Sequence, residues 1–247
     1  MWSVNVHSKV YLDKPVFVEG LPGIGNVGKI AVDYIIENFK ATLLRTYTSS
    51  SLPATAFVNS KNRVEVPKIF LFHSRVDGVD FLFLAGDVQP STTESVYDFC
   101  NLLLADLKRI NCKEVVTLGG IGYSSIPDNP KVLCASADSS IANKFVDIGA
   151  DANVFGIVGP ILGITGLMVG LARNYDLKAV ALLVETFNHP THLGLNESKS
   201  LLSILDKAYN LGVSFDHINS QISKLSGSES LMGRKAPLSR FETSYIG

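Results

Sequence analysis

The sequence predicts an α/β fold of three layers, a mostly parallel sheet with helices on both of its faces. Short apolar runs alternate along the chain with segments whose apolar residues recur every three or four positions. This alternation is typical of strands joined by helices. The runs are apolar on both faces, as buried parallel strands are.

Composition narrows the class of protein. The chain has 247 residues, of which 46% are hydrophobic and 18% charged, so it is long and apolar enough to bury a large core. A net charge of −1 does not favour nucleic acid or an acidic membrane as partner. Three cysteines without metal or redox spacing, in a chain without a signal peptide, indicate a reducing, cytoplasmic setting.

The elements follow in order. The expected strands are Val16–Val18, Leu43–Tyr47, Phe81–Ala85, Glu114–Leu118, Val154–Val158 and Ala179–Val184. Arg63–Val66 and Lys68–Phe72 are expected to form an added hairpin-like pair, interrupted by Pro67. The expected helices are Val27–Phe39, a helix after Pro90, Ser139–Ile148, Gly163–Arg173, one from Asn196 or Glu197 to Tyr209, and Phe215–Leu225.

The helix after Pro90 has the clearest pattern. Ser91 and Glu94 have the spacing of a capping box. The apolar residues that follow recur at spacings of three and four and predict one buried face: Val96, Phe99, Leu103, Leu107 and Ile110.

The stretch from Ala152 to Ala172 carries no charge and is long enough to cross a bilayer. Pro160 near its middle would break a spanning helix, and five glycines weaken one further. We therefore expect a buried strand, a turn and a buried helix. Residues 1–225 are predicted to form a single α/β domain, and residues 226–247, which begin Ser-Gly-Ser-Glu-Ser, a flexible C-terminal tail.

Gly20–Gly28 is the most informative stretch, because it follows an apolar run and opens a helix. Its second half fits G-x-G-x-x-G, the fingerprint of a dinucleotide site. Such a site also needs a carboxylate about 20 residues further on. The next predicted strand leads instead into Arg45-Thr-Tyr-Thr-Ser-Ser, which leaves only a phosphorylated dinucleotide open. The alternative is a turn that packs a helix closely against its strand.

Other small-residue segments leave the same ends of the predicted strands. They offer backbone amides and few reactive groups, and they suit either an anion or nucleotide pocket or close packing between segments and subunits. The candidate ligand-binding residues are Gly23, Gly25, Asn26, Gly119, Gly120 and Glu185. No nucleophile–base set is recognisable, so we name no catalytic residue and expect no cofactor. His189 and His192 lack further ligands at metal-site spacing, and no metal is expected.

Five motifs taken in order resemble the archaeal branch of the proteasome assembly chaperone family, proteasome assembly chaperone 2-like proteins of which some carry an ATP-grasp label. The motifs are Gly20–Gly28, Gly86–Pro90, Thr117–Gly122, Gly159–Leu167 and Leu182–Thr186. The resemblance implies a fold similar to purine nucleoside phosphorylase, a homo-oligomer, and a chaperone role rather than catalysis.

The resemblance also implies that a C-terminal hydrophobic-Tyr-X tail binds proteasome α subunits. This chain departs from that pattern, since it ends in Tyr245, Ile246 and Gly247, with the tyrosine third from the end. We expect these three residues to bind the partner. The alternative function is an enzyme or sensor that binds a nucleotide or nucleoside at the glycine-rich loops; a purely structural oligomer is a third.

Overall fold

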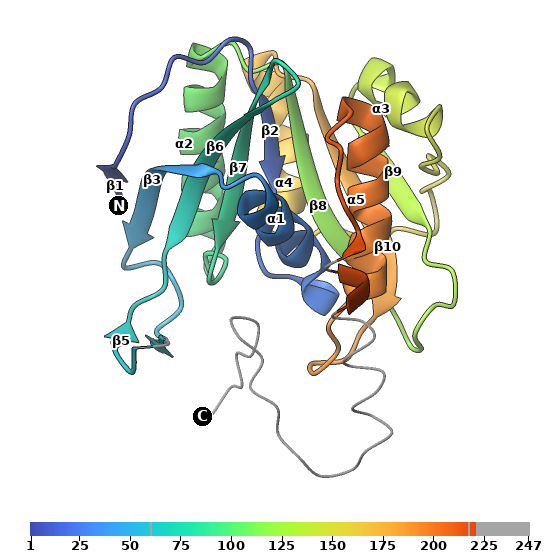
Figure 1. Ribbon diagram of the computed structural model, residues 1–247, viewed down its shortest axis with the longest axis horizontal. Helices are drawn as coiled ribbons and strands as arrows, with labels where there is room; N and C mark the ends of the chain where they lie inside the picture. The colour runs from blue at the N-terminus through green and yellow to red at the C-terminus, as the bar shows by residue number, and fades with distance from the viewer. Residues whose placement is uncertain (60, 217, 221–247) are drawn as a thin grey trace.

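The computed structural model describes residues 1–220 except residues 60 and 217. An eight-stranded sheet and a small two-stranded one carry five α-helices within this part of the chain (Figure 1). The strands are β1 (Trp2–Val6), β2 (Val16–Glu19), β3 (Thr42–Ser49), β4 (Phe57–Val58), β5 (Val64–Glu65), β6 (Ile69–Val76), β7 (Val79–Gly86), β8 (Glu114–Tyr123), β9 (Val132–Ser136) and β10 (Ala179–Phe187). The helices are α1 (Val27–Asn38), α2 (Thr93–Arg109), α3 (Ser139–Val146), α4 (Gly163–Ala172) and α5 (Leu195–Tyr209), with short 3₁₀ turns η1 (Ile24–Asn26) and η2 (Arg173–Tyr175).

The large sheet has the strand order β1-β3-β6-β7-β2-β8-β10-β9. Its centre is parallel, because β2 pairs in parallel with both β7 and β8, and β8 with β10. The outer strands are antiparallel, β1, β3 and β6 at one side and β9 at the other. The predicted parallel sheet is therefore the core of a mixed sheet.

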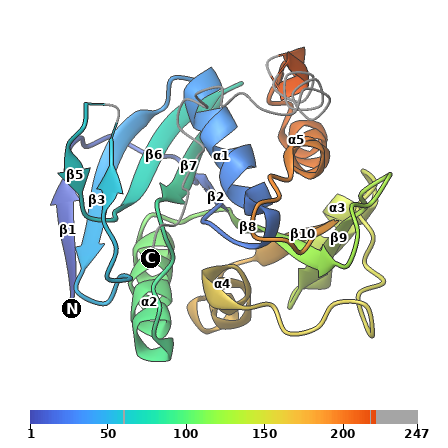
Figure 2. The same cartoon turned by 90° about the horizontal axis from the view of Figure 1, so that it is seen from below.

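Helices cover both faces of this sheet and create two cores (Figure 2). Helices α1, α3 and α5 lie on one face and α2 and α4 on the other. The central strands are buried from both sides, and every residue of β2 is buried. Burial on both faces is the reason that these strands read as continuous apolar runs.

The helix patterns hold in detail. In α2 the predicted face is buried or half-buried, with Phe99, Leu103 and Leu107 against the sheet. Its cap differs from the prediction: the Thr92 hydroxyl accepts from the Ser95 N–H, and the Ser95 hydroxyl accepts from the Thr92 N–H. The predicted pair, Ser91 and Glu94, is thus one position too early, a shift within the usual uncertainty of a helix end.

Two strand predictions were wrong. Residues Val154–Val158 form turns instead of a strand, with Phe155 98% exposed and Gly156 at φ +78°. The prediction rested on the apolar content of the segment alone. Residues 63–72 do not form a pair with each other: β5 pairs with β4, and β6 pairs with β3 and β7. Of the last predicted helix, Phe215–Leu225, residues 216 and 218–220 are helical and Phe215 is not. Residues 217 and 221–225 lie, like the predicted tail 226–247, outside the described residues.

In the part of the chain that the structure describes, no helix has both the length and the apolar content to cross a bilayer. The charge-free stretch is interrupted instead by turns, and only Gly163–Ala172 of it is α-helical.

Candidate functional site

The candidate site is the edge where the parallel strands end. The glycine-rich loop Gly20–Gly28 leaves β2 there, turns through η1, and enters α1 (Figure 1, lower edge of the sheet). Gly25 has φ +63° and Asn26 φ +52°, both left-handed. A left-handed pair allows the sharp reversal from strand to helix, and glycine adopts that conformation without steric cost.

Protein atoms fill the space beside this loop. A Cβ on Gly28 would overlap the carbonyl oxygen of Leu118 in β8 and lie 2.9 Å from its carbonyl carbon. A Cβ on Gly120 would lie 2.6 Å from the carbonyl oxygen of Ile24. Both positions have backbone as their obstacle, which cannot rotate away. Glycine at these positions therefore lets η1 and α1 lie directly on β8.

The loop between β10 and α5 packs against the other side of the glycine-rich loop. The Gly194 N–H donates to the Gly25 carbonyl at 2.9 Å, and a Cβ on Gly25 would lie 2.6 Å from Thr186 Oγ1. The hydroxyl of Ser198, in the first turn of α5, donates to the Val27 carbonyl at 3.0 Å. Hence α1, β10 and α5 meet at the glycine loop through main-chain groups and short hydroxyl side chains.

A buried acid lies on the opposite side of the loop. Glu19 ends β2, is fully buried, and accepts from the Leu21 N–H at 2.8 Å and the Thr165 hydroxyl at 3.1 Å. Burial raises its pKa to about 7, against the opposing hydrogen bonds from Leu21, Thr165 and the Leu118 backbone. The bond from Thr165 joins the acid to α4, and Thr117 of β8, which donates to the Thr165 carbonyl at 2.9 Å, adds a second link between α4 and the sheet.

Gln89 joins the loop to α4. Its amide nitrogen donates to the Pro22 carbonyl at 2.7 Å, and its amide oxygen accepts from the Ile164 N–H at 3.0 Å. The sequence interpretation missed both Glu19 and Gln89. A signal was available, since Glu19 is a lone carboxylate ending an apolar strand and Gln89 lies in one of the five motifs.

A second buried acid lies beside the glycine loop. Glu197 accepts from the Thr186 hydroxyl at 3.0 Å and pairs with His192 at 2.7 Å. His189 contacts Thr191 instead, at 3.0 Å, so the two predicted histidines do not share a centre. Within the described residues, no three potential metal-binding side chains come together.

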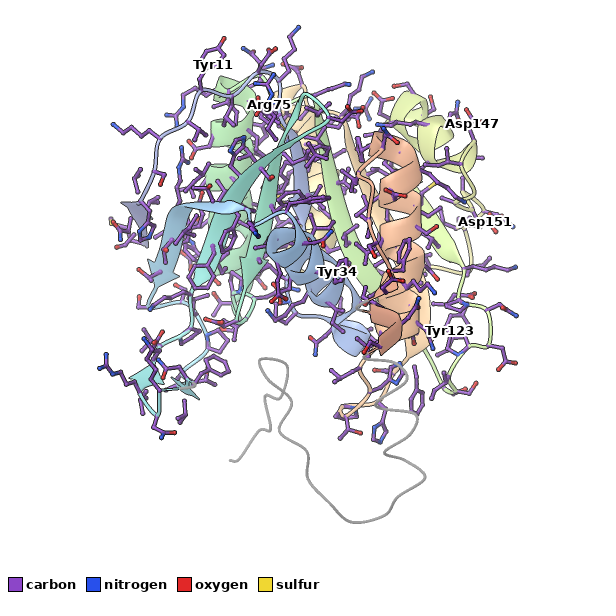
Figure 3. All side chains as sticks on the ribbon, viewed as in Figure 1. Tyr11, Tyr34, Arg75, Tyr123, Asp147 and Asp151 are labelled. Atoms are coloured by element: carbon purple, nitrogen blue, oxygen red, sulfur yellow. The ribbon has the colours of Figure 1, made fainter. Side chains whose placement is uncertain are left out.

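The predicted ligand residues occupy different surroundings. Gly25 is buried, Asn26, Gly119 and Gly120 are half-buried, and Gly23 is exposed with nothing within 4 Å of a Cβ. Glu185 accepts from the Tyr123 hydroxyl and the Lys131 N–H, each at 3.0 Å, and ties the β8–β9 loop to β10 (Figure 3 labels Tyr123). Ligand binding by these residues stays a prediction. Tyr245, Ile246 and Gly247 lie outside the described residues.

The buried acids and the cysteine near this edge are engaged by hydrogen bonds or shielded by burial. Glu19 and Glu197 are engaged by hydrogen bonds, and burial, with a smaller contribution from the charge of Glu19, raises the pKa of Cys100 to about 12. A thiol with so high a pKa is a poor nucleophile at neutral pH. Through these contacts Glu19 joins β2 to α4, and Glu197 joins α5 to β10.

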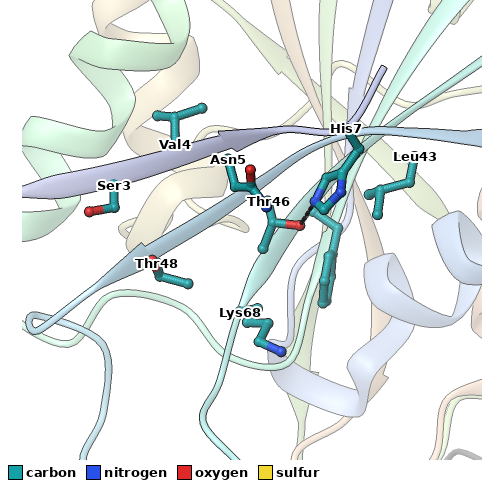
Figure 4. A pocket seen from close by; sticks show the side chains of 9 residues that line it. Ser3, Val4, Asn5, His7, Leu43, Thr46, Thr48 and Lys68 are labelled. Carbon is teal, nitrogen blue, oxygen red and sulfur yellow. Dashed lines mark hydrogen bonds between the residues drawn. The ribbon is translucent and has the colours of Figure 1, made fainter.

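A hollow of about 540 Å³ lies elsewhere, beside β1, β3 and β6 (Figure 4). His7 pairs with the Thr46 hydroxyl at 2.8 Å in it, and Lys68 and Phe70 contribute a cation and an aromatic ring. The hollow is an open trough on the sheet face, and the candidate residues predicted from the sequence are not among those that line it.

Comparison with known proteins gives one family. Residues 17–226 match the PAC2 family. Two uncharacterized proteins of Methanocaldococcus jannaschii are similar over most of their length. MJ1210 is 24% identical over 247 residues, 96% of this chain and 93% of its own, and MJ0106 is 25% identical over 218 residues, 85% and 82%.

Solved structures share the fold. PbaB of Pyrococcus furiosus, an archaeal proteasome activator, has a TM-score of 0.84 at 22% identity and covers 93% of this chain and 97% of its own. PbaA of the same organism, an archaeal homolog of proteasome-assembly chaperone, has a TM-score of 0.79 at 21% identity over 93% and 91%. These matches confirm the resemblance that the five motifs indicated. The ATP-grasp label and the likeness to purine nucleoside phosphorylase gain no support from them.

Proposed function

This chain belongs to the PAC2 family, and we propose on that basis that it is a non-enzymatic assembly chaperone or adaptor. It would act as a cytoplasmic homo-oligomer, with proteasome α subunits as the candidate protein partner. Similar solved structures include an archaeal proteasome activator and a homolog of proteasome-assembly chaperone, which supports this choice of partner.

One observation supports the non-enzymatic role most strongly. The segments that carry the five motifs contact one another: Gly28 meets Leu118, Gly25 meets Thr186, and Gln89 accepts from the Ile164 N–H. In α/β enzymes this edge of the sheet usually holds the ligand. Here helices and loops of the chain itself take that place.

The C-terminal residues Tyr245, Ile246 and Gly247 are the proposed contact with the partner. A ring, an aliphatic side chain and a terminal carboxylate on an extended segment suit a preformed pocket between subunits. Since the tyrosine stands third from the end, its ring reaches the same pocket as in a hydrophobic-Tyr-X tail only when the carboxylate shifts by one residue.

A pull-down with purified recombinant proteasome α subunits tests this proposal. The variants are a protein cut after Leu225, Tyr245→Ala, and the control Tyr11→Ala, which removes a ring that is 89% exposed. We expect the first two to lose at least tenfold in captured α subunit and the control to match the wild type. Equal capture by the cut and intact proteins would end the tail proposal. No capture by the intact protein would exclude α subunits as the partner.

A nucleotide- or nucleoside-binding role is the second candidate, and Gly23 favours it. Gly23 is exposed and its φ is −157°, so neither packing nor backbone conformation demands glycine there. Thermal shifts with nucleotides, nucleosides, NADP and phosphate test this candidate. A ligand at 100 times its dissociation constant adds about 2.7 kcal/mol of stability, and an unchanged melting temperature with all of them would count against it.

A further inference from the structure

Strand β1 ends the large sheet and has one partner, β3, among the described residues. The His7 N–H donates to the Leu44 carbonyl at 2.8 Å, in line with the β1–β3 register. In antiparallel pairs the hydrogen-bonded positions alternate, so Ser3 and Asn5 also bond to β3. The main-chain groups of Trp2, Val4 and Val6 therefore point to the free edge.

This edge lacks the usual protection against pairing. Natural edge strands carry charges, proline or bulges that block a second strand. Residues 2–6, Trp-Ser-Val-Asn-Val, contain neither charge nor proline, and their pairing with β3 is continuous. Val4 is 41% and Val6 50% exposed.

The strand is nevertheless held firmly in place. Trp2 stacks on Phe99 of α2, with ring centroids 4.1 Å apart. Successive strand residues point to opposite faces, so Val4 and Val6 share the face of Trp2. The edge thus presents three apolar side chains in a row and a set of main-chain donors and acceptors, on a strand that is already ordered.

We propose that β1 pairs antiparallel with β1 of a second copy of this chain, about a two-fold axis at Val4. The inference rests on the self-association in the proposed function and names its surface. Only this register pairs all five residues of both strands. It places Val4 against the partner's Val4 and Trp2 against the partner's Val6, an aromatic and β-branched pair of the kind that stabilises sheets.

The strand favours its own copy over an unrelated peptide because it is self-complementary. A two-fold contact uses the same patch on both subunits, and residues 2–6 bring no like charges together. Val10 and Tyr11, 38% and 89% exposed, follow the strand in sequence but lie beyond the exposed Lys9, and Figure 3 shows Tyr11 at the top of the molecule, away from β1.

A charge-swap experiment on full-length protein tests the two-fold axis itself. In Val4→Lys or Val4→Glu, the proposed contact sets two like charges directly opposite each other, whereas a mixture of the two variants sets opposite charges together. Sedimentation should show self-association at least tenfold weaker in each variant alone, restored in the equimolar mixture, and unchanged in the isosteric control Val4→Thr.

Proline provides a second test. The Val4 N–H points away from β3, so Val4→Pro removes a donor to the partner strand and leaves the β1–β3 ladder intact. Trp2 is the single tryptophan, and its fluorescence after dilution to monomer reports whether β1 still lies on Phe99. We expect Val4→Pro to be a smaller species with the wild-type monomer spectrum.

Two results would overturn the inference. One is a wild type that stays monomeric at high concentration; the edge would then be free for a partner's strand, which weaker α-subunit capture by Val4→Pro would reveal. The other is a wild-type oligomer that persists unchanged in both Val4→Lys and Val4→Pro. That result would place the subunit contact elsewhere and leave the chaperone proposal intact.

Discussion

Gly28 provides the sharpest test of the packing at the glycine loop. It is the second residue of α1, where alanine normally favours a helix by about 1 kcal/mol over glycine. Helix propensity alone therefore predicts that Gly28→Ala stabilises the protein. The structure predicts the opposite, because a Cβ there would overlap the Leu118 carbonyl oxygen and lie 2.9 Å and 3.1 Å from its carbonyl carbon and Cβ.

The size of the effect follows from these contacts. Adding a group to a well-packed site costs about 1–3 kcal/mol. The cost here belongs at the upper end, since the obstacle is the backbone of β8 at the centre of the sheet. After the helical gain is subtracted, the free energy of unfolding should fall by about 2 kcal/mol. For a protein of this size that lowers the melting temperature by about 4–8 °C.

Urea unfolding and calorimetry of Gly28→Ala measure this change. Gly23→Ala is the matched control in the same loop, since a Cβ there has nothing within 4 Å, and it should change the free energy of unfolding by less than about 0.5 kcal/mol. A Gly28→Ala protein as stable as the wild type, or more stable, would refute the reasoning that the glycines serve close packing.

Three further predictions concern the acids. Burial holds the pKa of Glu19 in the folded protein at about 7, above its ordinary 4.5, so as the pH rises the carboxyl group ionises in the unfolded chain before it does in the folded protein. The free energy of unfolding should therefore fall by about 3 kcal/mol between pH 4.5 and 8. Glu19→Gln should remove this pH dependence in denaturant titrations. Glu197→Ala leaves the buried Thr186 hydroxyl without its hydrogen-bond acceptor. It should lower the free energy of unfolding in urea by about 2 kcal/mol, more than Glu197→Gln does. Glu185→Gln, at a partly exposed contact, should change the unfolding free energy by under about 1 kcal/mol.

The centre of the fold was predictable from the sequence, and its edges were not. The strands β2, β7 and β10 are buried on both faces and are recognisable in the sequence as apolar runs. β1 was missed, since it is mostly exposed and is a strand only through its pairing with residues 45–49. Val154–Val158 failed for the opposite reason: the segment is apolar but has no strand neighbour.

The location of the candidate site was predictable, because parallel strands end at one edge. Its internal contacts were not. Glu19 and Thr165 are 146 residues apart in sequence and meet only in the folded chain. The glycine pattern likewise does not tell a ligand from a neighbouring backbone. The difference lies in what stands beside each missing Cβ, Leu118 at Gly28 and open space at Gly23.

The most direct test of the central claim is an NMR titration of the isotope-labelled full chain with ATP, NADP, adenosine and inorganic phosphate. The glycine loops hold protein segments together, so the amide signals of Gly25, Gly28, Gly119 and Gly120 should stay unchanged at millimolar ligand. Saturable shifts of these signals together, with any one compound, would show that the loops bind a small molecule and would contradict the account.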